Sequence, residues 1–139
     1  MSNIPQVLCA VKAVIMEGEK SLLVKQVVGD KVFWDLPGGR VNFGESPYDT
    51  LHREVKEETS LEVDIVRPIG MWWFFREKDG NQVVCNTFLC KLKKGSIDLS
   101  KNVAEESISE FRWVTKSEFL SGDYAVYESL KRLVQENIP

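Results

Sequence analysis

The feature that most constrains this chain is an acidic segment with the spacing of an amphipathic helix. Between residues 47 and 59, Tyr48, Leu51 and Val55 recur at the interval that places side chains on one helix face. Ser46 suits the start of such a helix, because its hydroxyl can accept a hydrogen bond from a free amide and the proline after it has no amide to leave unpaired. We therefore predict a helix from residue 47 to about residue 59.

Three glutamates of this helix, Glu54, Glu57 and Glu58, stand at i, i+3 and i+4, so their carboxylates project from one face. Like charges at this spacing destabilise a helix by about 0.2–0.5 kcal/mol per pair. A divalent cation would remove the repulsion, and carboxylate oxygens suit Mg²⁺, Mn²⁺ or Ca²⁺. The glutamates alone fit a solvated acidic face better, one that Arg53 and Lys56 partly compensate. The longer pattern around them favours a metal site.

The longer pattern consists of residues at fixed spacing, namely Gly39, Glu45, Arg53, Glu54, Val55, Glu57, Glu58 and Leu61. It resembles the Nudix box, G-x5-E-x7-R-E-U-x-E-E-x-G-U, in which U is an aliphatic residue. One fixed position of the box differs, because Ser60 stands where the family has glycine. An LPGG sequence before the box and a later Glu-x-x-Trp, from Glu110 to Trp113, are also similar to the family, so the resemblance extends over most of the chain.

The resemblance implies an α/β fold, namely a Nudix-like α/β/α sandwich with a mixed β-sheet. It also implies a pyrophosphohydrolase that depends on Mg²⁺ (or Mn²⁺) and cleaves a nucleoside diphosphate linked to another moiety. Our first expectation for the substrate is a nucleoside triphosphate, including a non-standard or oxidised one, cleaved to monophosphate and pyrophosphate. The alternatives are an ADP-ribose or nucleotide-sugar pyrophosphatase and a non-catalytic nucleotide-sensing domain. The substrate markers known in the family, a proline or a tyrosine after the box, are not found at the expected spacing.

The resemblance further implies roles for the box residues. The expected metal ligands are Gly39, through its backbone carbonyl, and Glu54, Glu57 and Glu58. The expected catalytic residues are Glu54, Arg53 and Glu57. Glu54 is either a further ligand or the base that deprotonates water, and Arg53 orients a neighbouring glutamate.

Further site residues are expected outside these positions. A cation near Lys25 contacts phosphate in many family members, although a solvent-facing strand lysine fits the sequence equally well. Aromatic residues are core fillers by default, and an outward-facing one could stack on a base. The expected substrate contacts are Lys25, Arg40, Trp34 and Trp73, and the expected extra metal ligand or base is Glu106 or Glu110.

Ser60 is expected to take a left-handed conformation, because the family glycine at this position follows the helix and such a conformation is common at helix ends. This would cost about 1 kcal/mol of stability. No ligand is lost, so we expect activity to survive.

With 139 residues, the chain is expected to form a single domain over residues 1–139. The net charge of −3 does not favour binding to a nucleic acid polymer. The expected partner, a small-molecule nucleotide, is what the resemblance implies. Three cysteines without metal-site spacing suggest reduced thiols and a cytoplasmic location. No signal peptide or membrane-spanning run is evident, so no membrane partner is expected. A homodimer is compatible with the sequence.

The remaining patterns predict the element order β-β-β-α-β-β-β-α. Strand segments are expected at residues 61–65 and 69–75, separated at Pro68. The last helix is expected from about Tyr124 to Glu136, with Tyr127 on its buried side.

Overall fold

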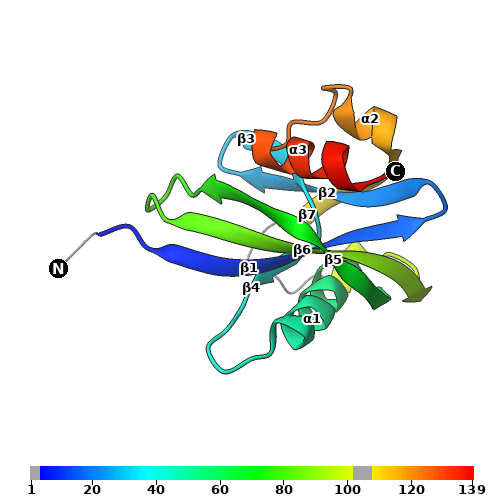
Figure 1. The fold of residues 1–139 in the computed structure, drawn as a ribbon, viewed down its shortest axis with the longest axis horizontal. Coiled ribbons are helices and arrows are strands. Elements are labelled where there is room, and N and C mark those ends of the chain that lie inside the picture. The colour runs from blue at the N-terminus through cyan, green and yellow to red at the C-terminus, as the bar shows by residue number, and fades with distance from the viewer. Residues whose placement is uncertain (1–3, 102–107) are drawn as a thin grey trace.

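A mixed β-sheet with helices on both faces forms the framework of the protein (Figure 1). The computed structural model describes residues 4–101 and 108–139. This architecture confirms the predicted α/β/α sandwich. The elements are β1 (Val7–Glu17), β2 (Lys20–Val28), β3 (Lys31–Asp35), β4 (Gly38–Arg40), α1 (Pro47–Thr59), β5 (Glu62–Phe75), β6 (Gln82–Lys94), the 3-10 turn η1 (Leu99–Lys101), β7 (Ile108–Thr115), α2 (Lys116–Leu120) and α3 (Glu128–Asn137).

Strand β1 lies at the centre of the sheet, whose order is β3-β2-β1-β6-β5. It pairs in parallel with β6 along most of its length. Its antiparallel pairing with β2 is confined to the hairpin end, at Met16 and Glu17. Farther along β1, at Ala10 to Lys12, the short strand β4 pairs with it instead, while β2 pairs with β3 and β7. The sheet is therefore split between β1 and β2, and β4 lies in the split.

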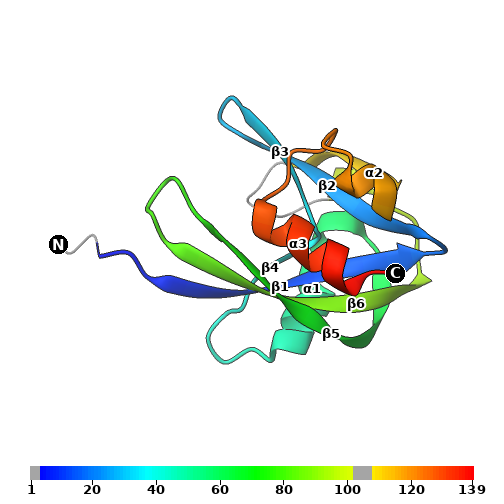
Figure 2. The same ribbon diagram turned by 45° about the horizontal axis from the view of Figure 1, so that its top comes forward.

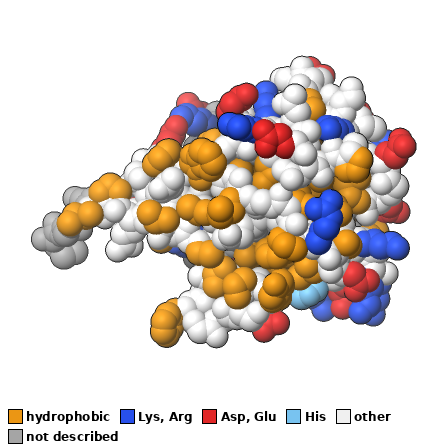
Figure 3. Space-filling model, in the orientation of Figure 1, with side chains coloured by type: hydrophobic (Ala, Val, Ile, Leu, Met, Phe, Trp, Pro, Cys, Tyr) orange, Lys and Arg blue, Asp and Glu red, His pale blue; other side chains and the backbone are white. Residues whose placement is uncertain are grey.

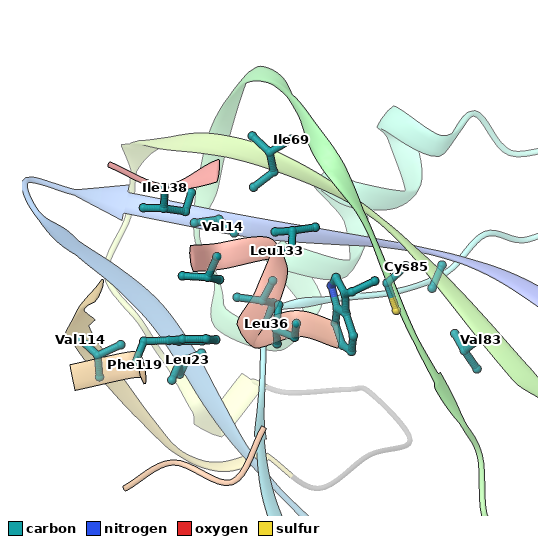
Figure 4. Close-up of a cluster of buried hydrophobic side chains, with 14 residues drawn as sticks. Val14, Leu23, Leu36, Ile69, Val83, Cys85, Val114, Phe119, Leu133 and Ile138 are labelled. Atoms are coloured by element: carbon teal, nitrogen blue, oxygen red, sulfur yellow. The ribbon is translucent and has the colours of Figure 1, made fainter. Parts of the chain in front are cut away.

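Side chains along β1 point alternately to the two faces of the sheet and contribute to a hydrophobic cluster on each face. Ala10 and Val14 belong to the cluster on the α3 side, whereas Val11 and Ala13 belong to the cluster on the α1 side. Figures 1 and 2 show α1 on one face and α2 with α3 on the other. In the described part of the chain, no helix is long and apolar enough to cross a membrane. The α3-side cluster, drawn in Figure 4, includes Val14, Leu23, Leu36, Phe119 and Leu133.

Helix α1 has the predicted bounds, and both of its ends follow from local sequence. At its start the Ser46 hydroxyl accepts a hydrogen bond from the Tyr48 amide at 3.2 Å. At its end Ser60 adopts the left-handed conformation, with φ 70° and ψ 9°, and its amide donates to the Lys56 carbonyl. Ser60 is the one described residue other than glycine with a positive φ. The expected left-handed conformation is therefore confirmed.

Two expectations about the later elements were wrong in detail. Helix α3 begins at Glu128 rather than near Tyr124, because the Ala125 carbonyl accepts a hydrogen bond from the Trp34 amide of β3 and the backbone there is not helical. Tyr127 precedes the helix and is 36% exposed. Strand β5 is continuous through Pro68, with register shifts around it. An edge strand tolerates the missing amide of proline, and β5 is an edge strand.

Replacing Ser60 tests the strain at the end of α1. Ser60→Gly and Ser60→Ala both remove the hydroxyl that donates to the Asp98 carbonyl at 3.3 Å, so they differ only in the Cβ atom. Because a left-handed backbone disfavours a Cβ, we expect the glycine variant to be more stable than the alanine variant by about 1 kcal/mol in urea unfolding. Equal stabilities would contradict the strain.

Candidate active site

The candidate site lies where β4 passes the C-terminal half of α1. The Gly38 amide donates a hydrogen bond to Glu58 Oε1 at 2.7 Å. The next residue, Gly39, packs so closely against Glu54 that an added Cβ would lie 2.5 Å from the carboxyl carbon of that side chain. The two glycines therefore allow a strand backbone to approach two carboxylates of the helix directly.

Arg53 joins the other acidic side chains of the site. Its guanidinium makes a bidentate contact with Glu45, with Nε 2.8 Å from Oε2 and Nη2 2.9 Å from Oε1. Nη1 donates to Glu54 Oε1 at 3.0 Å and to Glu57 Oε2 at 3.2 Å. The Thr50 hydroxyl also donates to Glu45, at 2.7 Å. One arginine thus holds three carboxylates in a half-buried network.

These contacts divide the carboxylates into two electrostatic classes. Hydrogen bonds from Arg53 and Thr50 lower the pKa of Glu45 to about 2. Burial raises the pKa of Glu54, against the opposing effect of Arg53. Burial also raises the pKa of Glu58, to about 8, although Lys12 and the Gly38 amide oppose the shift. The side chain of Glu58 is 1% exposed, so its ionisation needs a compensating positive charge.

The chemistry of these groups fits a hard divalent cation. Carboxylate and backbone carbonyl oxygens are the donors that Mg²⁺ and Mn²⁺ prefer. In residues 4–101 and 108–139, no three acidic, histidine or cysteine side chains already converge as a metal-ligand set. The cause is visible in the network, since Arg53 holds Glu54 and Glu57 while Glu58 points to the Gly38 amide. To bind a metal ion, these glutamates would therefore have to give up contacts to Arg53.

The residues expected to contact substrate lie in other parts of the sheet. Lys25 of β2 is paired in register with Trp34 of β3 and with Glu110 of β7. Glu110 forms an ion pair with Arg112 at 2.8 Å, and the Arg112 guanidinium lies 5.9 Å from the Trp34 ring centre. These side chains form a group of their own on three adjacent strands.

Two other expected contacts are exposed. Arg40 is exposed at the end of β4, directly after Gly39. Trp73 is 49% exposed on the edge strand β5, between the exposed Met71 and Phe75. Figure 3 shows hydrophobic side chains gathered on the left of the view, at the end of the molecule that carries the β5–β6 hairpin. Glu106 lies outside the described residues.

A recess of about 300 Å³ opens between β3 and the segment before α3. Phe33 and Tyr127 line it, with ring centres 6.2 Å apart and planes inclined by 65°. Lys31 lines the same recess and pairs with Glu77, which follows β5. The recess offers a mostly apolar surface beside one cation.

Two charged residues beneath the site, Lys12 and Asp35, were not expected from the sequence. Lys12 is 5% exposed and Asp35 is 3% exposed, and their charged groups lie 2.9 Å apart. A lysine within the apolar run VLCAVKAVI was the available signal, because lysine is rarely buried without a partner. The partner could not be identified from spacing, since 23 residues separate the two.

Comparisons with known proteins place most of the chain in one family. A model of the NUDIX domain family matches residues 8–135. The chain is 31% identical to Nudix hydrolase 7 of Arabidopsis thaliana over 126 residues, which cover 86% of this chain and 43% of that protein. It is 42% identical over 59 residues to a putative 8-oxo-dGTP diphosphatase of Bacillus subtilis, covering 42% of this chain and 38% of that protein. The chain thus spans less than half the length of these two relatives.

The fold also matches a solved structure closely. The crystal structure of the MutT protein from Methanosarcina mazei superposes with a TM-score of 0.80, covering 95% of this chain and 93% of that chain. The sequence identity between the two is 24%. This likeness concerns the fold.

The raised pKa of Glu58 predicts how pH changes the stability of the metal-free protein. The folded state binds the Glu58 proton more tightly than the unfolded state, in which the pKa is near 4.5. The resulting stabilisation is complete below pH 4.5 and is lost as the pH rises through about 8. Glu58→Gln removes this dependence. In EDTA, we therefore expect the melting temperature of the variant minus that of the wild type to increase from pH 5 to pH 9.

Glu128→Gln, an exposed substitution on α3, controls for the loss of one carboxylate elsewhere. Melting curves of Glu58→Gln and wild type that shift in parallel with pH would contradict the buried, protonated state of Glu58.

The two glycines of β4 should respond differently to alanine. At Gly38, where φ is 146°, a Cβ would lie 2.1 Å from the Val11 carbonyl oxygen, so backbone must move and we expect a loss of about 3 kcal/mol in urea unfolding. At Gly39 the three atoms nearest to an added Cβ all belong to the flexible end of Glu54. We expect Gly39→Ala to change stability by less than about 1 kcal/mol while it displaces the Glu54 carboxylate. Equal destabilisation by both would refute this difference.

Proposed function

The chain belongs to the Nudix hydrolase family, and we propose that it is a metal-dependent pyrophosphohydrolase that cleaves a nucleoside triphosphate to the monophosphate and pyrophosphate. The observation that carries the proposal is the network in which Arg53 holds Glu45, Glu54 and Glu57 beside the buried Glu58. A solvated acidic helix face would need neither the burial nor the shared arginine.

Nudix hydrolases generally use divalent metal ions such as Mg²⁺ or Mn²⁺. We assign Glu57, Glu58 and the Gly39 carbonyl to holding such an ion, with Glu54 beside them. When bound, the ion would neutralise charge on the phosphate oxygens and lower the pKa of a coordinated water. Pyrophosphate esters resist attack because their oxygens repel nucleophiles, and this chemistry removes that obstacle.

Glu54 is the residue we assign as proton acceptor. Its carboxylate is half-buried against Gly39, and burial raises its pKa, which strengthens it as a base. The contact of Arg53 Nη1 with Oε1 fixes the direction of the carboxylate. Arg53 is itself held by the bidentate contact with Glu45, so it acts as a positioning residue for Glu54.

The substrate beyond the phosphates has candidate contacts on two sides. Arg40 is exposed one residue after Gly39, where a cation could contact a phosphate oxygen. The recess lined by Phe33 and Tyr127 suits a planar base, because aromatic rings offer stacking surface. Lys25 and Trp34 lie on the strands next to this recess and remain assigned to substrate binding, together with the exposed Trp73.

The choice of a triphosphate rests on similarity. One relative is named as a putative 8-oxo-dGTP diphosphatase, and the similarity to it favours an oxidised or standard nucleoside triphosphate over ADP-ribose. The cysteines Cys9, Cys85 and Cys90 are free, which supports a reducing, cytoplasmic location. A homodimer remains a prediction.

Substitution of Glu57 tests the assignment. Loss of a metal ligand should cost at least the ten- to hundredfold typical of residues that only support ligands, so we expect Glu57→Gln to lower pyrophosphate release by about 100-fold or more. The assay presents the purified chain with a panel of nucleoside triphosphates, ADP-ribose and nucleotide sugars, with Mg²⁺ or Mn²⁺, and identifies the products.

Glu128→Gln is the matched control, because Glu128 is exposed on α3 and lies outside the proposed site. If the wild type binds a nucleotide tightly but turns over none of the compounds, the chain is a nucleotide-sensing domain and not a hydrolase. If Glu57→Gln turns over substrate as fast as the wild type, the assignment of Glu57 as a metal ligand is wrong.

A further inference from the structure

Lys12 and Asp35 form a buried ion pair that the proposed reaction does not use. Their side chains are 6% and 4% exposed, and Lys12 Nζ lies 2.9 Å from Asp35 Oδ2. Transfer of two charges out of water is costly, and a well-packed apolar pair is often as stable as a buried ion pair. Stability alone therefore explains this pair poorly, and its contacts suggest another role.

Both side chains bind the backbone of the turn that leads into the site. Lys12 Nζ donates to the Leu36 carbonyl at 3.3 Å, and the Leu36 amide donates to Asp35 Oδ1 at 2.7 Å. The following residue is held as well, because the Ala13 amide donates to the Pro37 carbonyl at 2.9 Å. The turn is thus tied to β1 at successive residues.

The turn then reaches the site at Gly38. The Gly38 amide donates to Glu58, and Gly38 is paired in register with Lys12. A Cβ on Gly38 would lie 2.8 Å from Lys12 Cα and 3.0 Å from Lys12 Cδ, so the lysine stem forms the wall against which the turn packs. A displacement of Lys12 would therefore move the amide that binds Glu58.

The charge of Lys12 is balanced by that of Asp35. Lys12 faces the carboxylates of Asp35 and Glu58, and although burial opposes it, their attraction raises the pKa of Lys12 above its ordinary value. Asp35 neutralises the ammonium group, so the lysine adds little net positive charge beneath a site that must attract a cation.

We propose that Lys12 and Asp35 are a positioning pair, which holds the turn of residues 36–38 where the Gly38 amide and the Gly39 carbonyl meet the carboxylates of α1. The proposal rests on the proposed metal-dependent function. It makes metal affinity depend on two side chains that touch neither metal nor substrate.

The test uses the double variant Lys12→Met with Asp35→Asn, which leaves no unpaired charge in the interior. We expect it to melt near the wild-type temperature in EDTA. Its Mn²⁺ affinity, measured by calorimetry or by electron paramagnetic resonance of free Mn²⁺, should be about 10- to 100-fold weaker, as is typical when a residue that supports ligands is lost. Amide hydrogen exchange should accelerate at Gly38 but not at Val14 in the core.

Cys90→Ala is the matched control, because it removes another buried group, one whose thiol contacts the Phe88 carbonyl on β6 rather than the turn. It should leave Mn²⁺ affinity unchanged. If the double variant does not fold, Lys12→Arg, which keeps a cation opposite Asp35 but alters the contact with the Leu36 carbonyl, undergoes the same measurements, with weaker Mn²⁺ binding and faster Gly38 exchange expected.

Wild-type Mn²⁺ affinity and wild-type Gly38 exchange in a folded variant would overturn the positioning role while leaving the proposed function intact. Failure of the wild type itself to bind Mn²⁺ would overturn the proposed function. The two failures are therefore distinguishable.

Discussion

The crowding of carboxylates on one side of α1 is the constraint on which the rest of the structure depends. Glu54, Glu57 and Glu58 repel one another, and Glu58 is almost fully buried. The Arg53 guanidinium and the Gly38 amide relieve part of this repulsion. Neither solution is complete, because burial still raises the pKa values of Glu54 and Glu58. The site is thus built at a cost in stability that a divalent ion would offset.

The sheet is arranged so that backbone can reach these carboxylates. Because β1 and β2 separate after their hairpin, β4 can pair with β1 and bring two glycines against α1. A side chain at Gly39 would occupy the space of the Glu54 carboxylate, and one at Gly38 would collide with β1. The split in the sheet, the glycine pair and the acidic helix therefore depend on one another. A change in any of them moves the oxygen atoms that we assign to the metal.

The parts of the structure that depend on local sequence were predictable, and those that depend on distant contacts were not. The helix start at Ser46 and the left-handed Ser60 follow from neighbouring residues and appeared as expected. The late start of α3 depends on a hydrogen bond between Trp34 and Ala125, which no local pattern reveals. The bidentate contact of Arg53 with Glu45 also bridges the loop before the helix, whereas spacing along the helix indicates only the Glu57 contact. The Lys12 and Asp35 pair was hidden for the same reason.

The most direct measurement is the anomalous scattering of Mn²⁺ in crystals of the protein. The account predicts a Mn²⁺ peak beside the carboxylates of Glu57 and Glu58 and the Gly39 carbonyl, with Arg53 released from Glu57 but still bound to Glu45. The account is contradicted if the Mn²⁺ peak lies elsewhere. It is also contradicted if no peak appears at saturating Mn²⁺ and every contact of Arg53 is unchanged, because Arg53 alone would then compensate these carboxylates.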